Sequence, residues 1–271
     1  MLSLLTTVVS KLMFRRAASS IWLALCLPVL ADAAAPVPAD QLVVAGNACG
    51  PTALLNAFRF GNLDWQRAAS AIAGDTDKQR IYTIIRESGM RPSHSIKGRP
   101  RWSRKGVNLA DLHDIANELT RGHFLPLMSE EVLFLKPGET QEKLLRRVHS
   151  RLETSLTKGL PPIISLRRYA LRRQDKNPPA WVVLDAHFVT ITSVPGKLDK
   201  NPHSFPVTYI DPWGGKICHG LISIPARPVL ASAAADSPCL EAVFPQALVG
   251  KKLIRNGEPT ALTVAAVLGR W

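Results

Sequence analysis

The sequence predicts an α+β fold, in which a helical lobe is followed by an antiparallel sheet. Up to about residue 160, apolar residues recur at helical spacing, whereas the later runs are β-branched or alternating and are separated by Pro, Gly and Asn. Segregated helices and strands favour an α+β fold over a doubly wound parallel sheet. With 271 residues and 46% apolar content, the chain can bury a core as one domain.

The first 35 residues have the pattern of a secretory signal peptide. They contain a positive flank ("KLMFRR"), an apolar run ("AASSIWLALCLPVLA") and small residues suited to a signal peptidase ("ADAAAP"). An uncleaved anchor is the alternative, but about 15 apolar residues fall short of the roughly 20 that span a bilayer. We therefore expect a signal peptide at 1–35 and a secreted or periplasmic protein that does not span the membrane after cleavage. The folded domain is expected over 36–271, with a helical half at 36–160 and a sheet half at 161–271.

The helical half begins with a helix predicted over 50–60, which has Pro51 in its first turn and Leu54 and Phe58 on one apolar stripe. Further helices are expected at 64–73, 76–88, 108–122 and 139–159, with Asp64, Thr76 and Asn108 as N-caps and Gly159 at the last C-terminus. A basic loop at 89–106 separates the third helix from the fourth.

The sheet half contains five runs with strand character. They are 161–170, 180–194, 204–212, 216–224 and 240–249. Because each run is short and is bounded by turn residues, we expect the strands to pair in an antiparallel manner.

The number and spacing of the cysteines predict one free thiol that takes part in no disulfide. Export leaves three cysteines in an oxidising compartment, namely Cys49, Cys218 and Cys239. The two late cysteines lie near each other in the sequence, so we expect a disulfide between them. Cys49 is then a free thiol, and a secreted protein that keeps one usually has a use for it.

Cys49 stands at the predicted start of the first helix, where unpaired N–H groups and the helix dipole stabilise a thiolate. His187 lies near the start of an apolar strand, and Asp211 ends the next strand. If these strands pair, the carboxylate can orient the imidazole, which then accepts the thiol proton. Asp185, two residues before His187, is a second candidate for orienting the ring. The alternative is that His187 is a core histidine and Asp211 a turn residue before a proline.

These motifs resemble those of the papain-like cysteine peptidases, and among them the bacterial group related to the bacteriocin-processing peptidases. The resemblance rests on "NACGPTALLNAF", "AHFVTITSV" and "YIDPWGG" and covers roughly half of the chain after residue 35. It implies a papain-like fold, with Cys49 as nucleophile, His187 as general base and Asp211 as the orienting residue.

The chain departs from this family at the oxyanion hole. The family usually has a Gln six residues before the nucleophile, and here that position is Val43. Gln41 and Asn47 are the nearby amides that could take its place, and the backbone N–H of Cys49 is a further donor. Of the two side chains, we favour Asn47 as the oxyanion donor.

The formal net charge is +13, and seven positive residues lie between Arg86 and Lys105. Such a cluster is compatible with an acidic surface or polymer as a partner, but a solvated surface that aids solubility is the simpler explanation and the one we favour. No zinc pattern or helix-turn-helix punctuation accompanies the charge, so no specific nucleic-acid binding is expected. The histidines show no zinc-ligand spacing, and we expect no metal and no cofactor.

The sequence thus predicts an exported thiol hydrolase that cleaves a peptide or amide bond through an acyl-enzyme intermediate, with a peptide or protein as substrate. Transfer of the acyl group to an amine, as in a transglutaminase, uses the same groups. The other alternative is a non-catalytic module that binds an acidic polymer or protein partner.

Overall fold

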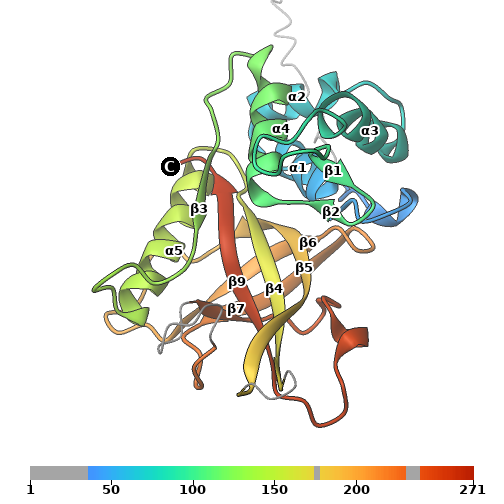
Figure 1. The fold of residues 1–271 in the computed structure, drawn as a ribbon. Helices are drawn as coiled ribbons and strands as arrows, with labels where there is room; N and C mark the ends of the chain where they lie inside the picture. Colours follow the sequence, from blue (N-terminus) through green and yellow to red (C-terminus); the bar gives the residue numbers. More distant parts are fainter. Residues whose placement is uncertain (1–35, 174–177, 230–238) are drawn as a thin grey trace, which may run out of the picture. The chain divides into compact units, whose positions relative to one another are not determined.

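The computed structural model describes residues 36–173, 178–229 and 239–271, and the predicted signal peptide at 1–35 lies outside them (Figure 1). The helices are α1 (Cys49–Arg59), α2 (Leu63–Ala71), α3 (Asp77–Ile84), α4 (Leu109–Arg121) and α5 (Gln141–Thr157), with short turns η1 (Gln41–Val43), η2 (Ile85–Gly89) and η3 (Lys251–Leu253). No helix in these ranges is long and apolar enough to cross a membrane.

The helix boundaries follow local capping chemistry. Thr76 accepts a hydrogen bond from Gln79 N in a capping box, and Asn108 caps α4 as expected. The N-cap predicted at Asp64 is wrong, because Asn62 accepts the hydrogen bonds of the first turn and α2 begins one residue after it. Gly159 has φ of +78°, the left-handed conformation that follows many helix C-termini.

The strands form two sheets. A small hairpin pairs β1 (Trp102–Ser103) with β2 (Gly106–Val107). The large sheet contains β3 (Ser129–Val132), β4 (Ile163–Arg172), β5 (Ala180–Ser193), β6 (Ser204–Asp211), β7 (Lys216–Ser223), β8 (Leu240–Val243) and β9 (Thr260–Gly269). Its order is β3-β9-β4-β5-β6-β7-β8, and all of the pairings are antiparallel.

The large sheet closes on itself, and this overturns the predicted papain-like α+β fold. β9 pairs with β4 on one side and with β8 on the other, through Leu240 opposite Val264 and Glu241 opposite Thr263. The six strands from β9 round to β8 therefore make a closed antiparallel barrel, with the helices outside it. The prediction failed because it missed β9. All residues of that strand except Thr260 are buried, so "TALTVAAVLG" shows no alternation between apolar and polar positions.

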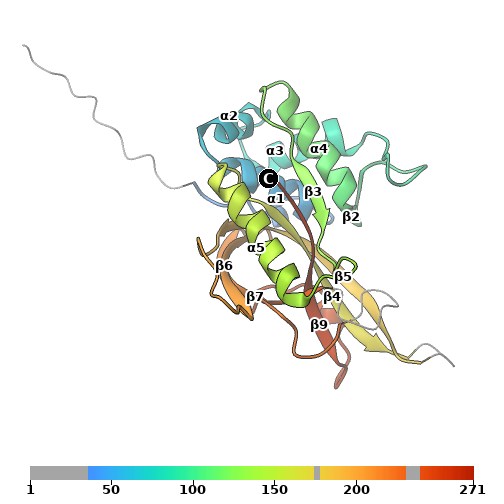
Figure 2. The same cartoon turned by 90° about the vertical axis from the view of Figure 1, so that its left-hand side faces the viewer.

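Two apolar clusters organise the packing. One joins the helices around α1 to the barrel through Ile163, Phe188 and Leu268, and the other fills the space between the barrel strands and α5. Figure 1 shows α1–α4 gathered at one end of the barrel, and Figure 2 shows α5 lying along its side. α1 is thereby held against the strands that carry the candidate site.

The predicted disulfide between Cys218 and Cys239 is absent, and both residues are thiols. β7 pairs with β8 in a register that places Ser223 opposite Glu241, so Cys239 lies beyond that end of the ladder. Cys218 is five residues back along β7, a distance of roughly 16 Å at about 3.3 Å per residue. A disulfide needs Cα atoms within about 7 Å, so proximity in the sequence was misleading.

Candidate active site

Cys49 is the first residue of α1, and no side chain caps this helix end. Its N-cap residue is Ala48, which offers no side-chain acceptor, so the first backbone N–H groups stay available. The positive end of the helix dipole lies at the Cys49 sulfur and favours a thiolate there. The side chain is 3% exposed.

Gly50 allows this helix end to pack tightly. A Cβ at this position would lie 2.4 Å from Val107 Cγ1, and within 3.5 Å of Leu112 and Phe188. A methyl group would therefore push against Val107 of β2, while its approaches to Leu112 of α4 and Phe188 of β5 are ordinary van der Waals contacts. The glycine beside Cys49 is explained by this close approach.

Gly50→Ala is expected to destabilise the protein by about 1–3 kcal/mol, the usual cost of overpacking a core. Thermal or denaturant unfolding measures the change. Gly122→Ala is the matched control, because Gly122 has an ordinary helical φ of −73° and no atom lies within 4 Å of its Cβ position. Equal unfolding free energies for the two variants would contradict the packing argument.

β5 brings His187 to the helix start. Thr190 Oγ1 on this strand donates a hydrogen bond of 2.8 Å to the carbonyl of Ala53, one turn into α1. His187 lies three residues earlier on β5, is buried, and lies near enough to Cys49 for the thiol to raise the pKa of the ring. A pair that is 138 positions apart in the sequence is therefore brought together.

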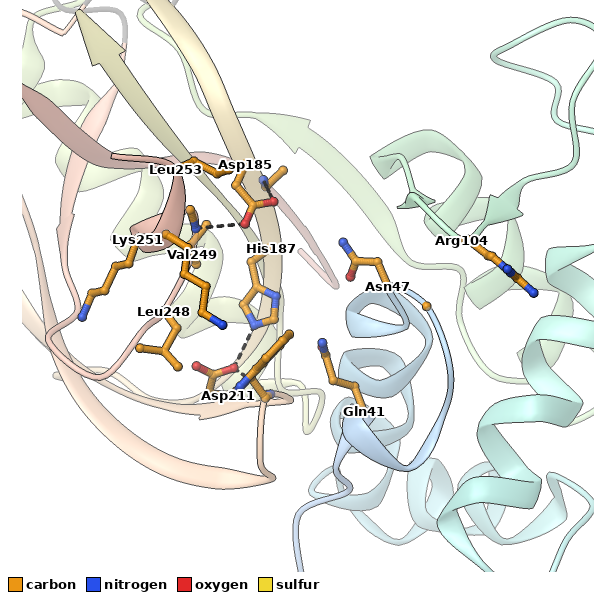
Figure 3. A pocket seen from close by; sticks show the side chains of 15 residues that line it. Gln41, Asn47, Arg104, Asp185, His187, Asp211, Leu248, Val249, Lys251 and Leu253 are labelled. Carbon is orange, nitrogen blue, oxygen red and sulfur yellow. Dashed lines mark hydrogen bonds and ion pairs between the residues drawn. The ribbon is translucent and has the colours of Figure 1, made fainter. Parts of the chain in front are cut away.

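Asp211 holds the other side of the ring. Its Oδ1 lies 2.8 Å from His187 Nε2, and it also accepts a 2.8 Å hydrogen bond from the backbone N–H of Trp213 (Figure 3). The β5–β6 register places Thr190 opposite Ile210, so His187 and Asp211 leave the ladder on the same face. Because Nε2 is engaged by Asp211, Nδ1 is the ring nitrogen left for Cys49.

The environment of His187 favours its protonated form. Burial lowers the pKa of His187, but the hydrogen bonds to Asp211 and Cys49 and the negative charge of these two groups outweigh that effect. The net result is a pKa raised from 6.5 to about 10. At neutral pH the imidazolium can therefore pair with the Asp211 carboxylate on one side while its other ring nitrogen faces Cys49.

Two amides reach the same pocket. Gln41 is buried, and its backbone N–H donates to Pro212 O at 2.8 Å, which ties it to the turn after Asp211. Its side-chain Oε1 has no hydrogen-bond partner, and Figure 3 shows its amide end directed toward His187 and Asp211. Asn47 also lines the pocket, while Val43 does not. Of these two candidate donors, Asn47, which the sequence favoured, is half-buried, whereas Gln41 is buried and anchored.

The segment before α1 is anchored at two further points. Asn56 on α1 accepts from Ala39 N at 2.7 Å and donates to Ala39 O at 3.2 Å. Asp40 Oδ1 accepts from Gly214 N at 2.9 Å. One helix therefore fixes both Cys49 and the segment that carries Gln41.

A pocket of about 580 Å³ opens over these side chains. Besides Gln41, Asn47, His187 and Asp211, its lining includes Trp213 and the segment 248–253. Sequence reasoning missed this wall, because it assigned 240–249 to a strand; β8 instead ends at Val243, and Pro245 follows in the turn. The proline inside the run was the available signal.

Asp185, the other candidate for orienting the ring, has a different role. Its Oδ2 accepts from Gly250 N and its Oδ1 from Ala186 N, both at 2.9 Å. It fastens the 248–253 wall to β5 and makes no hydrogen bond with His187. No cluster of three or more His, Cys, Asp or Glu side chains that could hold a metal ion is found in the described part of the chain.

The geometry stands without support from known relatives. A scan against models of protein families finds no match, and a search of curated protein sequences finds none that is significantly similar.

Proposed function

We propose that the protein is a cysteine hydrolase that cleaves a peptide or amide bond. One observation carries the proposal: the buried His187 ring is hydrogen-bonded to Asp211 and lies beside the thiol at an uncapped helix start. An aligned thiol, imidazole and carboxylate form an activated nucleophile. The motifs that resemble papain-like peptidases supply these three residues, although the closed barrel departs from the fold of that family.

In the first half of the reaction, the Cys49 thiolate attacks the substrate carbonyl carbon and the carbonyl electrons move onto oxygen. The backbone N–H of Cys49 and the Gln41 amide are the donors for this oxyanion, and Asn47 lines the pocket on the same side as Gln41 (Figure 3). As the tetrahedral intermediate collapses, the C–N bond breaks and His187 gives its proton to the leaving amine. A thioester on Cys49 remains.

In the second half, the neutral His187 ring takes a proton from water, and the hydroxide attacks the thioester. Collapse releases the carboxylic acid and restores the thiolate and imidazolium. Asp211 keeps its hydrogen bond to Nε2 throughout, so Nδ1 stays aimed at the reacting atoms. An amine in place of water would give acyl transfer, and product analysis with added amine distinguishes the two reactions. Export to the periplasm or the exterior stays a prediction from residues 1–35.

Alkylation by iodoacetamide at pH 7 tests the proposal, because the chain contains its own controls. Burial raises the pKa of Cys218, and burial raises that of Cys239 to about 11, so both should react slowly. Cys49 should be modified well before either, and His187→Ala should slow its modification on the order of 10-fold or more. Peptide mapping by mass spectrometry gives the three rates.

Two results would count against the proposal. Similar slow rates at all three cysteines would mean that Cys49 is an ordinary buried thiol. A Cys49 rate that does not change in His187→Ala would mean that the ring does not activate it. Either result would leave the non-catalytic module as the better account of the chain.

A further inference from the structure

Cationic side chains stand at both ends of the active-site pocket. Lys251 and Lys252 come from η3, and Arg104 comes from the turn between β1 and β2. In Figure 3, Lys251 extends away from His187 on one side and Arg104 extends away on the other. None of the ion pairs within 36–173, 178–229 and 239–271 involves any of the three.

Other basic residues near the pocket are neutralised within the fold. Arg91, Arg99 and Arg101 form ion pairs with acidic residues of α4, among them a 2.8 Å contact between Arg101 and Glu118. Arg104 follows the same basic run but has no such partner. Three basic residues of this segment, Lys97, Arg104 and Lys105, make no ion pair with the described residues, and of these three Arg104 lines the pocket.

The carboxylates of the pocket do not cancel this charge. Asp211 is bonded to His187, and both oxygens of Asp185 accept backbone N–H groups. Asp185 also faces Arg168 across the β4–β5 ladder. Lys251 donates to Pro245 O at 3.0 Å, a neutral acceptor that leaves its charge uncompensated.

Between the cations, the wall is apolar. Leu248, Leu253 and Trp213 line the pocket and are each about half exposed. The wall is held in place by Asp185, by the 3.2 Å hydrogen bond from Arg168 Nε to Val249 O, and by Gly250 in the left-handed conformation. Half-exposed large apolar side chains around a cleft mark a binding surface.

We propose that the substrate is an acidic peptide segment, with a large apolar side chain against Leu248 and Leu253 and carboxylates near Lys251 and Lys252. This inference rests on the proposed hydrolase function, since it names the substrate class of the same site. A segment that extends across the pocket places its acidic groups at the cationic ends and its apolar group on the wall between them. Exposed charge pairs are individually weak, so the preference should be modest and sensitive to salt.

Binding provides a test that does not require turnover. Fluorescein-labelled octapeptides of alternating glutamate and leucine, or glutamine and leucine, are titrated into Cys49→Ala, and anisotropy gives the two dissociation constants. The acidic peptide should bind about 3- to 10-fold more tightly at low salt, as expected for a few exposed charge pairs. In Lys251→Glu/Lys252→Glu combined with Cys49→Ala, this preference should vanish or reverse.

Lys197→Glu/Lys200→Glu is the matched control, because it changes the net charge equally at two exposed lysines that do not line the pocket. It should retain the preference. Equal affinity of Cys49→Ala for the acidic and the neutral peptide would overturn the inference. So would a loss of the preference for the acidic peptide that is as large in Lys197→Glu/Lys200→Glu as in Lys251→Glu/Lys252→Glu.

A proteome-derived peptide library digested with the wild-type protein separates the two proposals. Cleavage sites enriched in glutamate and aspartate would support both. Cleavage without acidic enrichment would overturn the substrate class and leave the hydrolase function intact. Absence of cleavage would count against the hydrolase, while the binding comparison would still decide whether the pocket prefers acidic peptides.

Discussion

Cys49→Ala is expected to abolish turnover of any peptide that the wild-type protein cleaves, with a loss of at least about 10⁴-fold in kcat. The methyl group cannot form the thioester, and no serine or threonine is among the residues that line the pocket beside His187. The measurement is cleavage of a peptide identified from the library, followed by mass spectrometry. Folding should be preserved, because alanine is only one sulfur atom smaller than cysteine at this buried position.

Cys218→Ala provides the matched control. Both cysteines are 3% exposed, but Cys218 lies on β7 and packs among the barrel residues. Its replacement should leave kcat within about a factor of 2, while each variant loses a similar amount of buried surface. Residual activity of Cys49→Ala at the level of Cys218→Ala would assign the cleavage to another group or to a contaminant.

Cys49 and Asp211 could be predicted as site candidates because each one sits at an element boundary that local chemistry defines, whereas His187 lies within β5. Pro51 sets the first turn of α1, and the Asp-Pro pair ends β6 at Asp211. The contact between His187 and Asp211 depended only on two neighbouring strands pairing, which is the commonest outcome for consecutive strands. Bringing Cys49 to this pair also required α1 to pack against β5.

The closed barrel could not be predicted from local sequence features. Barrel closure depends on the pairing of β9 with β4 and β8, and β9 lacks alternation because both of its faces are covered. The lost disulfide has the same origin, since the register of β7 and β8 separates two cysteines that are close in sequence. Register and closure are properties of long-range pairing, and composition carries little information about them.

The position of Gln41 depends on a long-range contact. Counting back from Cys49 leads to Val43 or favours the nearer Asn47, whereas the backbone N–H of Gln41 is held by Pro212, much later in the chain. That contact forms only when β6 has reached α1. Local sequence features therefore could not predict that Gln41 would be held in the pocket.

Asp211→Asn is expected to lower kcat/KM about 10²- to 10⁴-fold at pH 7 while preserving the fold, since the two side chains have the same shape. In the wild-type protein, the pKa of His187 is raised to about 10, so the imidazolium is present below that pH and is lost as the pH rises through it. The amide cannot supply the carboxylate charge, and the effect of burial then lowers the pKa. The alkaline limb of the pH profile should therefore move to lower pH in the variant.

The profile of kcat/KM from pH 5 to 10.5, together with the pH dependence of Cys49 alkylation, measures this displacement. Asp64→Asn is a suitable control, because Asp64 is an exposed surface residue that pairs only with Arg67 in an i, i+3 contact. It should reproduce the wild-type profile. A variant at Asp211 that kept both the rate and the alkaline limb would show that the 2.8 Å contact with His187 holds the ring in place without setting its charge.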